Sequence, residues 1–156
     1  MAGLMHDFLL VARKEFDYWD SSNFYNHPQA IHLHDDLMHY IGDSLKWIPC
    51  HVPARRNKLH EHKGLNFYGP TIIKEEGASA AHNIFSLWAE LFSLAPKVLK
   101  LTGAWGWIEG EPAESGKYST IIVERDKVVI TFRQIAEYGK RVIASEGSLY
   151  ILHMGI

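Results

Sequence analysis

Apolar residues spaced three and four apart predict three helices in the first two thirds of the chain. The first would span residues 3–19, and the second would begin at Pro28, with Asn26 or His27 as its cap, and end at Gly42. The third would begin at Ser79 and end before Pro96, which cannot continue a helix. Their buried faces would be Met5, Phe8, Leu9, Ala12, Phe16 and Trp19 in the first, Ile31, Leu37, Met38 and Ile41 in the second, and Ile84, Phe85, Trp88, Leu91 and Phe92 in the third.

Beyond Pro96 the apolar spacing changes to two, which is typical of strands. Strands are predicted over residues 99–107, 118–123 and 128–132, and the last two would form a hairpin around Arg125 and Asp126. A helix over 134–143 and a short strand over 149–153 would complete the chain. Residues 49–70, with three prolines and two glycines, are expected to form a long irregular loop, and residues 109–117 a connection.

This order of elements predicts an α+β fold, with helices packed on one face of a mostly antiparallel sheet, in a single domain over residues 1–156. Strands and helices do not alternate strictly, which argues against a doubly wound nucleotide-binding sheet. The 156 residues, of which 47% are hydrophobic, suffice for one core. The longest early apolar run, residues 8–12, is too short for a secretion signal or a membrane span, so we expect a cytoplasmic protein.

Signatures of common enzyme classes are missing from the sequence. It contains no Gly-rich phosphate-binding loop. Ser79 lies in a Gly-Ala-Ser-Ala-Ala segment that faintly resembles a nucleophile elbow, but a helix cap explains it better. Cys50 and His51 are adjacent, and adjacent side chains of an extended segment point to opposite faces. Cys50 is therefore interpreted as a quiet, partly buried cysteine.

Histidine is the residue type that most favours an enzyme, because the chain has ten. On a helix, His32, Asp36 and His39 would share one face, with side chains that suit zinc or another divalent cation. His60 and His62 could add a ligand. A small metal-dependent hydrolase or nuclease built on the His32/Asp36/His39 face is therefore one hypothesis. The other interpretation is a solvated polar face, and we assign no metal, no cofactor and no catalytic residue.

Charge is distributed unevenly around a net value of −2. Residues 1–50 carry three basic and seven acidic side chains, a net charge of −4, whereas residues 51–63 carry a net charge of +3. The basic segment lacks the interleaved aromatic residues that stack on bases, so nucleic acid is not the expected partner. Carboxylates on a rigid support favour a basic protein partner. The candidate partner-binding residues are Asp17, Asp20, Asp35, Asp36 and Asp43, with Glu109, Glu111 and Glu114 as a second patch.

One segment resembles a known class of proteins. Residues 83–96, from Asn83 through Trp88 to Pro96, and residues 99–105, ending at Trp105, resemble a helix–strand unit of bacterial immunity proteins. These proteins protect against the toxins of contact-dependent growth inhibition and related polymorphic systems. The resemblance implies a cytoplasmic, non-enzymatic protein that neutralises one cognate protein toxin, often a nuclease, by binding over its active site. A third hypothesis is an interaction module unconnected with toxins.

Overall fold

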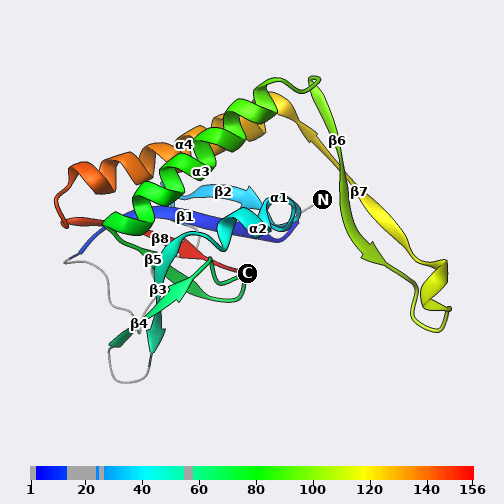
Figure 1. Cartoon of the computed structure of the whole chain (residues 1–156), viewed down its shortest axis with the longest axis horizontal. Coiled ribbons are helices and arrows are strands. Elements are labelled where there is room, and N and C mark those ends of the chain that lie inside the picture. Colours follow the sequence, from blue (N-terminus) through cyan, green and yellow to red (C-terminus); the bar gives the residue numbers. More distant parts are fainter. Residues whose placement is uncertain (1–2, 14–23, 25–26, 55–57) are drawn as a thin grey trace.

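The first and last strands of the chain pair at the centre of a six-stranded sheet (Figure 1). The computed structural model describes residues 3–13, 24, 27–54 and 58–156. The strand order is β2-β1-β8-β5-β3-β4, and every pairing is antiparallel. The strands are β1 (Met5–Ala12), β2 (Ile31–His34), β3 (Pro49–Ala54), β4 (Lys58–Lys63), β5 (Pro70–Ile73) and β8 (Leu149–Met154).

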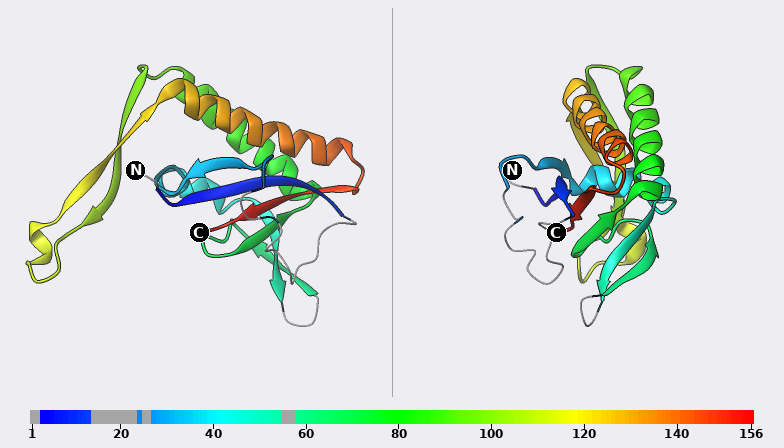
Figure 2. Two further views of the ribbon diagram at one scale, coloured as in Figure 1. Left: turned by 180° about the vertical axis from the view of Figure 1, so that it is seen from behind. Right: turned by 90° about the vertical axis from the view of Figure 1, so that its left-hand side faces the viewer.

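Two long helices, α3 (Glu75–Ser93) and α4 (Arg125–Ala144), lie side by side on one face of this sheet (Figure 2). The main core fills the space between them and the strands, with Phe8, Phe85 and Phe132 fully buried. Two short helices, α1 (Asp35–Tyr40) and α2 (Gly42–Leu45), connect β2 to β3. The predicted α+β class, with helices on one face of a mostly antiparallel sheet, is confirmed. No helix in the described part of the chain is long and apolar enough to cross a membrane.

A two-stranded arm projects from the body between α3 and α4 (Figure 1). It consists of β6 (Val98–Gly106) and β7 (Lys117–Glu124), joined by a connection that contains the short 3-10 helix η2 (Ala113–Ser115). At its root, Leu99 is buried against the main core. The strands predicted near 99–107 and 118–123, and the connection between them, are therefore confirmed.

The N-terminal helix prediction is wrong for the described residues 3–13, because Met5–Ala12 is the strand β1. β1 has covered faces on both sides, with Phe8 in the main core and Leu9 and Val11 in a second cluster on the opposite face. A strand buried on both faces carries a continuous apolar run, which also matches helical spacing. Residues 14–19 of the predicted helix lie outside the described part.

The second predicted helix and the predicted loop are also corrected. Residues 31–34 form β2, and the helix begins only at Asp35, where the side chain of His34 accepts a hydrogen bond from the backbone N–H of Asp36. Residues 49–70 contain β3, β4 and the first residue of β5 rather than an irregular loop. Charged and histidine side chains along β4 hid this strand, because β4 is a solvent-facing edge of the sheet.

Two boundaries in the second half of the chain also differ from the prediction. α3 begins at Glu75, so Ser79 lies inside the helix and is not its cap. Residues 128–132 belong to α4, and no hairpin forms at Arg125 and Asp126. Val128, Val129 and Phe132 have strand-forming side chains, but they are buried at helical spacing, so tertiary packing overrides local preference. The helix predicted over 134–143 and the strand over 149–153 are confirmed.

Candidate functional site

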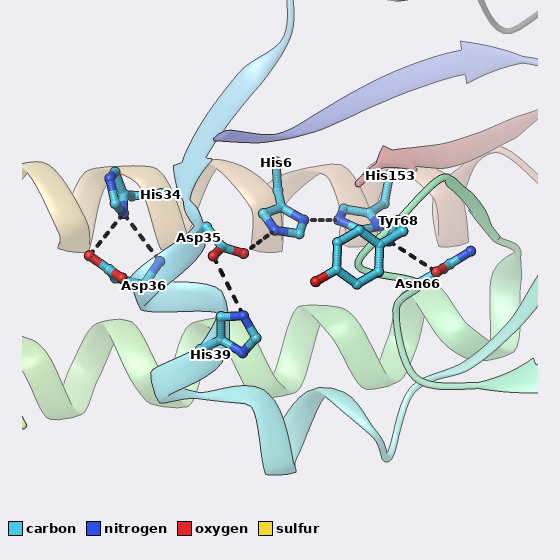
Figure 3. Close-up of polar contacts among 8 residues, drawn as sticks. All are labelled: His6, His34, Asp35, Asp36, His39, Asn66, Tyr68 and His153. Atoms are coloured by element: carbon cyan, nitrogen blue, oxygen red, sulfur yellow. Dashed lines mark hydrogen bonds and ion pairs between the residues drawn. The ribbon is translucent and has the colours of Figure 1, made fainter. Parts of the chain in front are cut away.

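A chain of polar side chains crosses the core between the central strands and α1 (Figure 3). His6 of β1 and His153 of β8 are fully buried, and Nδ1 of His6 lies 2.9 Å from Nε2 of His153. Nε2 of His6 lies 2.9 Å from Oδ1 of Asp35, the first residue of α1. Nδ1 of His153 lies 3.5 Å from the hydroxyl of buried Thr71, which sits opposite it in the β5–β8 pairing. The contacts therefore join three strands of the sheet to α1.

One arrangement of protons satisfies every contact in this chain. Burial lowers the pKa of His6, against the opposing effect of Asp35, and burial followed by the nearby His6 lowers the pKa of His153, so both imidazoles are neutral. The Asp35 carboxylate can only accept, so Nε2–H of His6 donates to it and Nδ1 of His6 accepts from Nε2–H of His153. Nδ1 of His153 then accepts from the Thr71 hydroxyl, whose oxygen accepts from the backbone N–H of Asn66 at 2.8 Å.

The polar chain reaches the surface at His39 of α1. Nε2 of His39 lies 3.5 Å from the second carboxylate oxygen of Asp35, and its ring stacks on Phe67 with centroids 4.6 Å apart. A helix of six residues has little stability alone. Its contacts through Asp35 and His39 therefore fix α1 on the sheet. Sequence reasoning missed His6 and His153, and the available signal was a histidine within an apolar strand pattern at each end of the chain.

The residues exposed on α1, on α2 and just after α2 form what we call the α1–α2 surface: Asp36, His39, Tyr40, Asp43, Lys46 and Trp47. Trp47 is 69% exposed, whereas the ring of Tyr40 also packs on Trp88 and Phe92 of α3. Hollows flank this surface, one next to the root of the arm and one next to β4. Nζ of Lys46 donates to Oδ1 of Asp43 at 2.7 Å, and this contact lowers the pKa of Asp43. The surface thus combines aromatic side chains with two carboxylates, one of which is paired with the ammonium group of Lys46.

The structure distributes the predicted partner-binding residues over separate places. Asp36 and Asp43 are exposed on the α1–α2 surface. The side chain of Asp35 is only 16% exposed and its carboxylate already bonds His6, so its part is to hold α1 in place. Glu109, Glu111 and Glu114 are exposed at the far end of the arm, in the connection between β6 and β7. Asp17 and Asp20 lie outside the described residues.

The proposed metal-binding face does not form on one helix. His32 belongs to β2, where its Nδ1 lies 2.6 Å from Oδ1 of Asp7, whereas Asp36 and His39 belong to α1. His60 and His62 lie on the outer strand β4. The described ranges hold no group of three or more His, Cys, Asp or Glu side chains placed to bind a metal ion. The hydrolase hypothesis therefore loses the shared helix face on which it was based.

Cys50 and His51 have separate environments, as expected for neighbours in a strand. Cys50 is buried, its thiol donates to the carbonyl oxygen of Gly64 at 3.1 Å, and burial raises its pKa to about 11. A thiol with this pKa is a poor nucleophile at neutral pH. Burial also lowers the pKa of His51.

Comparison with known proteins gives no relative from which a function could be transferred. No family model, no curated protein and no solved structure matches this chain.

Proposed function

We propose that this chain is an immunity protein that binds a cognate bacterial toxin and neutralises it by covering the toxin's active site. The observation that carries the proposal is the α1–α2 surface, which presents aromatic and carboxylate side chains from a short segment held rigidly on the sheet. The resemblance of residues 83–96 and 99–105 to immunity proteins of contact-dependent growth inhibition supports the same function. The protein would act in the cytoplasm, where the toxin arrives, without catalysis or a cofactor.

The composition of the surface suits tight binding to a protein. Tryptophan and tyrosine supply much of the binding energy at protein interfaces. Trp47 is 69% exposed, whereas tryptophan side chains are on average highly buried. Asp36 and Asp43 would steer a basic partner and set its orientation. A toxin active site that attracts these carboxylates would be basic, as are sites that bind anionic substrates. A nuclease, whose substrate is a polyanion, is therefore the class of toxin that fits best.

Rigidity of the supporting segment contributes separately. Ordering a flexible segment on binding costs about 0.5–1.5 kcal/mol for each immobilised side chain. The Asp35–His6 hydrogen bond and the stacking of His39 on Phe67 hold α1 before any partner arrives. The binding surface is therefore prepared in the free protein.

The proposal predicts that a toxin gene lies next to the gene for this chain, and the test uses the toxin domain that it encodes. Cells that produce this toxin should survive when they also express the wild-type chain. The Trp47→Ala variant should protect less well and bind the purified toxin with a loss of about 2 kcal/mol or more, because truncating a central aromatic residue has this effect. Leu87→Ala, which truncates an exposed residue of α3 away from this surface, is the matched control and should protect fully. Wild-type chain that neither protects cells nor binds this toxin would refute the proposal.

A further inference from the structure

The outer edge of β7 lacks the usual protections of an exposed strand edge. Between Lys117 and Glu124 the strand has six uncharged residues in succession, Tyr118–Val123, without proline. The other strand of the arm, β6, has a bulge between Thr102 and Trp105, and bulges protect strand edges. On the outer side of β7, the described part of the chain places no strand. The outer strands of the main sheet differ, because β2 has only four residues and β4 is rich in charged side chains. Unprotected edges pair with further strands.

We propose that β7 pairs antiparallel with β7 of a second copy of this chain, across a two-fold axis at Thr120, so that two arms form one four-stranded sheet. This inference concerns the arm and does not depend on the toxin-binding function. A two-fold axis perpendicular to a sheet keeps each face continuous, so opposing residues must lie on the same face. Pairing Thr120 with Thr120 of the second copy meets this condition. It places Tyr118 opposite Ile122 of the second copy and, by symmetry, Ile122 opposite Tyr118 of the second copy.

This register brings together the side chains that the single chain leaves uncovered. Tyr118 and Ile122 are 62% and 63% exposed, whereas Ile121, on the opposite face, is 6% exposed. Trp105 pairs with Tyr118 and contacts its ring, so it extends the same outer face. Cross-strand pairs of an aromatic and a β-branched residue stabilise a sheet, and threonine pairs add hydrogen bonds. An isolated two-stranded arm gains the most from such additional strands.

The apolar side chains at the two ends of the arm fit the same arrangement. Antiparallel pairing carries the tip of one arm past the root of the other. Beside the root, β7 borders a groove with apolar lining residues that include Met5, Leu37 and Val98. Lys127 and Glu124 also line it, and Nζ of Lys127 donates to Oε1 of Glu124 at 2.8 Å. The tip carries exposed Trp107 and Ile108 with three glutamates. Each tip therefore offers exposed apolar side chains to a groove that is itself lined by apolar residues, and this complementarity favours a second copy as the occupant.

The mass of the purified chain in solution tests this proposal. Light scattering at increasing protein concentration should show a particle of twice the chain mass of 17.8 kDa. Ile122→Glu should raise the dimer dissociation constant roughly tenfold or more, since the symmetry axis repeats each lost contact. Ile130→Glu is the matched control, because Ile130 is a similarly exposed isoleucine on α4. Both isoleucines are exposed, so both variants should fold, as circular dichroism would show.

A cysteine at the axis tests the register itself. Thr120→Cys should form a disulfide between two chains under mild oxidation. Thr102→Cys should not, because Thr102 lies on β6, where it pairs with Thr120. The two copies of Thr102 would therefore lie three strand spacings apart, roughly 14 Å for strands spaced ~4.8 Å. A chain that is monomeric at every concentration, or Thr120→Cys protein that stays monomeric while Thr102→Cys cross-links, would overturn the proposal. Protection of the β7 amides from hydrogen exchange only in a toxin complex would also overturn it, by making the toxin the occupant of this edge.

Discussion

The carboxylate of Asp35 completes a buried hydrogen-bond chain that has one consistent set of donors and acceptors. If it is removed, Nε2–H of His6 loses its acceptor inside the core. An unsatisfied buried donor costs about 1–3 kcal/mol. We expect Asp35→Ala to lower the free energy of unfolding by this amount in urea titrations. Asp36→Ala, at the next residue but largely exposed, should change it by less than about 0.5 kcal/mol. Equal effects of the two substitutions would contradict the chain as described.

The same histidines make the stability of the protein depend on pH. The pKa of His6 and that of His153 are lowered in the folded state, mainly by burial. As the pH falls, the unfolded chain therefore binds protons at these histidines at a higher pH than the folded chain does. Above about pH 6.5 both states are neutral at these residues, and below it proton uptake favours unfolding. The free energy of unfolding should therefore fall as pH is lowered from 7 toward 5, measured by urea titration at each pH. His153→Asn, which removes one titrating group, should show a shallower fall.

Sequence reasoning at the residue level identified exposed chemistry better than buried chemistry. Asp36 and Asp43 were predicted as partner-binding carboxylates, and the structure places both on the surface. The predicted metal-binding face that joins His32 to His39 requires a helix across residue 34. The strand β2 ends at that residue instead. The contact between His6 and His153 joins residues 147 positions apart. No local pattern encodes such a contact, because it depends on β1 and β8 pairing.

At the scale of elements, the packing of α3 on α4 depends on a close approach at Gly139. A Cβ atom added there would lie 2.6 Å from the carbonyl oxygen of Ala78 in α3. Gly139→Ala should therefore destabilise the protein by about 1–3 kcal/mol, even though alanine favours helices. At Gly42 of α2 an added Cβ has open space around it, so Gly42→Ala should be neutral or stabilising by up to about 1 kcal/mol. Thermal unfolding of both variants would show the contrast.

Elements with one solvent-facing side were predictable, and those buried on both sides or charged at an edge were not. α4 was recognised in its second half, where polar residues alternate with Ile135 and Val142 at helical spacing. The arm strands are predictable because apolar and polar residues alternate in β6 near its root, as Leu99, Lys100 and Leu101 show. β1 is apolar on both faces, and its continuous apolar run also fits the spacing of a helix. β4 is polar along its length, and its sequence is typical of a loop. In both cases the neighbouring strands and helices, rather than local sequence, decide the structure.

At the scale of the whole molecule, the two acidic patches predicted from the sequence belong to different structures and have different proposed partners. Asp36 and Asp43 lie on the α1–α2 surface and would meet the toxin. Glu109, Glu111 and Glu114 lie at the tip of the arm and would meet the second copy of the chain. Substitutions in the two patches should therefore separate toxin binding from dimerisation.

The affinity for the proposed cognate toxin domain, measured for two charge-reversed variants, tests the proposed function most directly. Asp36→Lys/Asp43→Lys should weaken binding strongly and reduce its dependence on salt, because these carboxylates would face a basic cleft. Glu111→Lys/Glu114→Lys should leave toxin affinity close to that of the wild type and affect only the dimer. All four residues are exposed, so both variants should fold. Binding that ignores salt and survives the Asp36/Asp43 reversal would contradict the central claim.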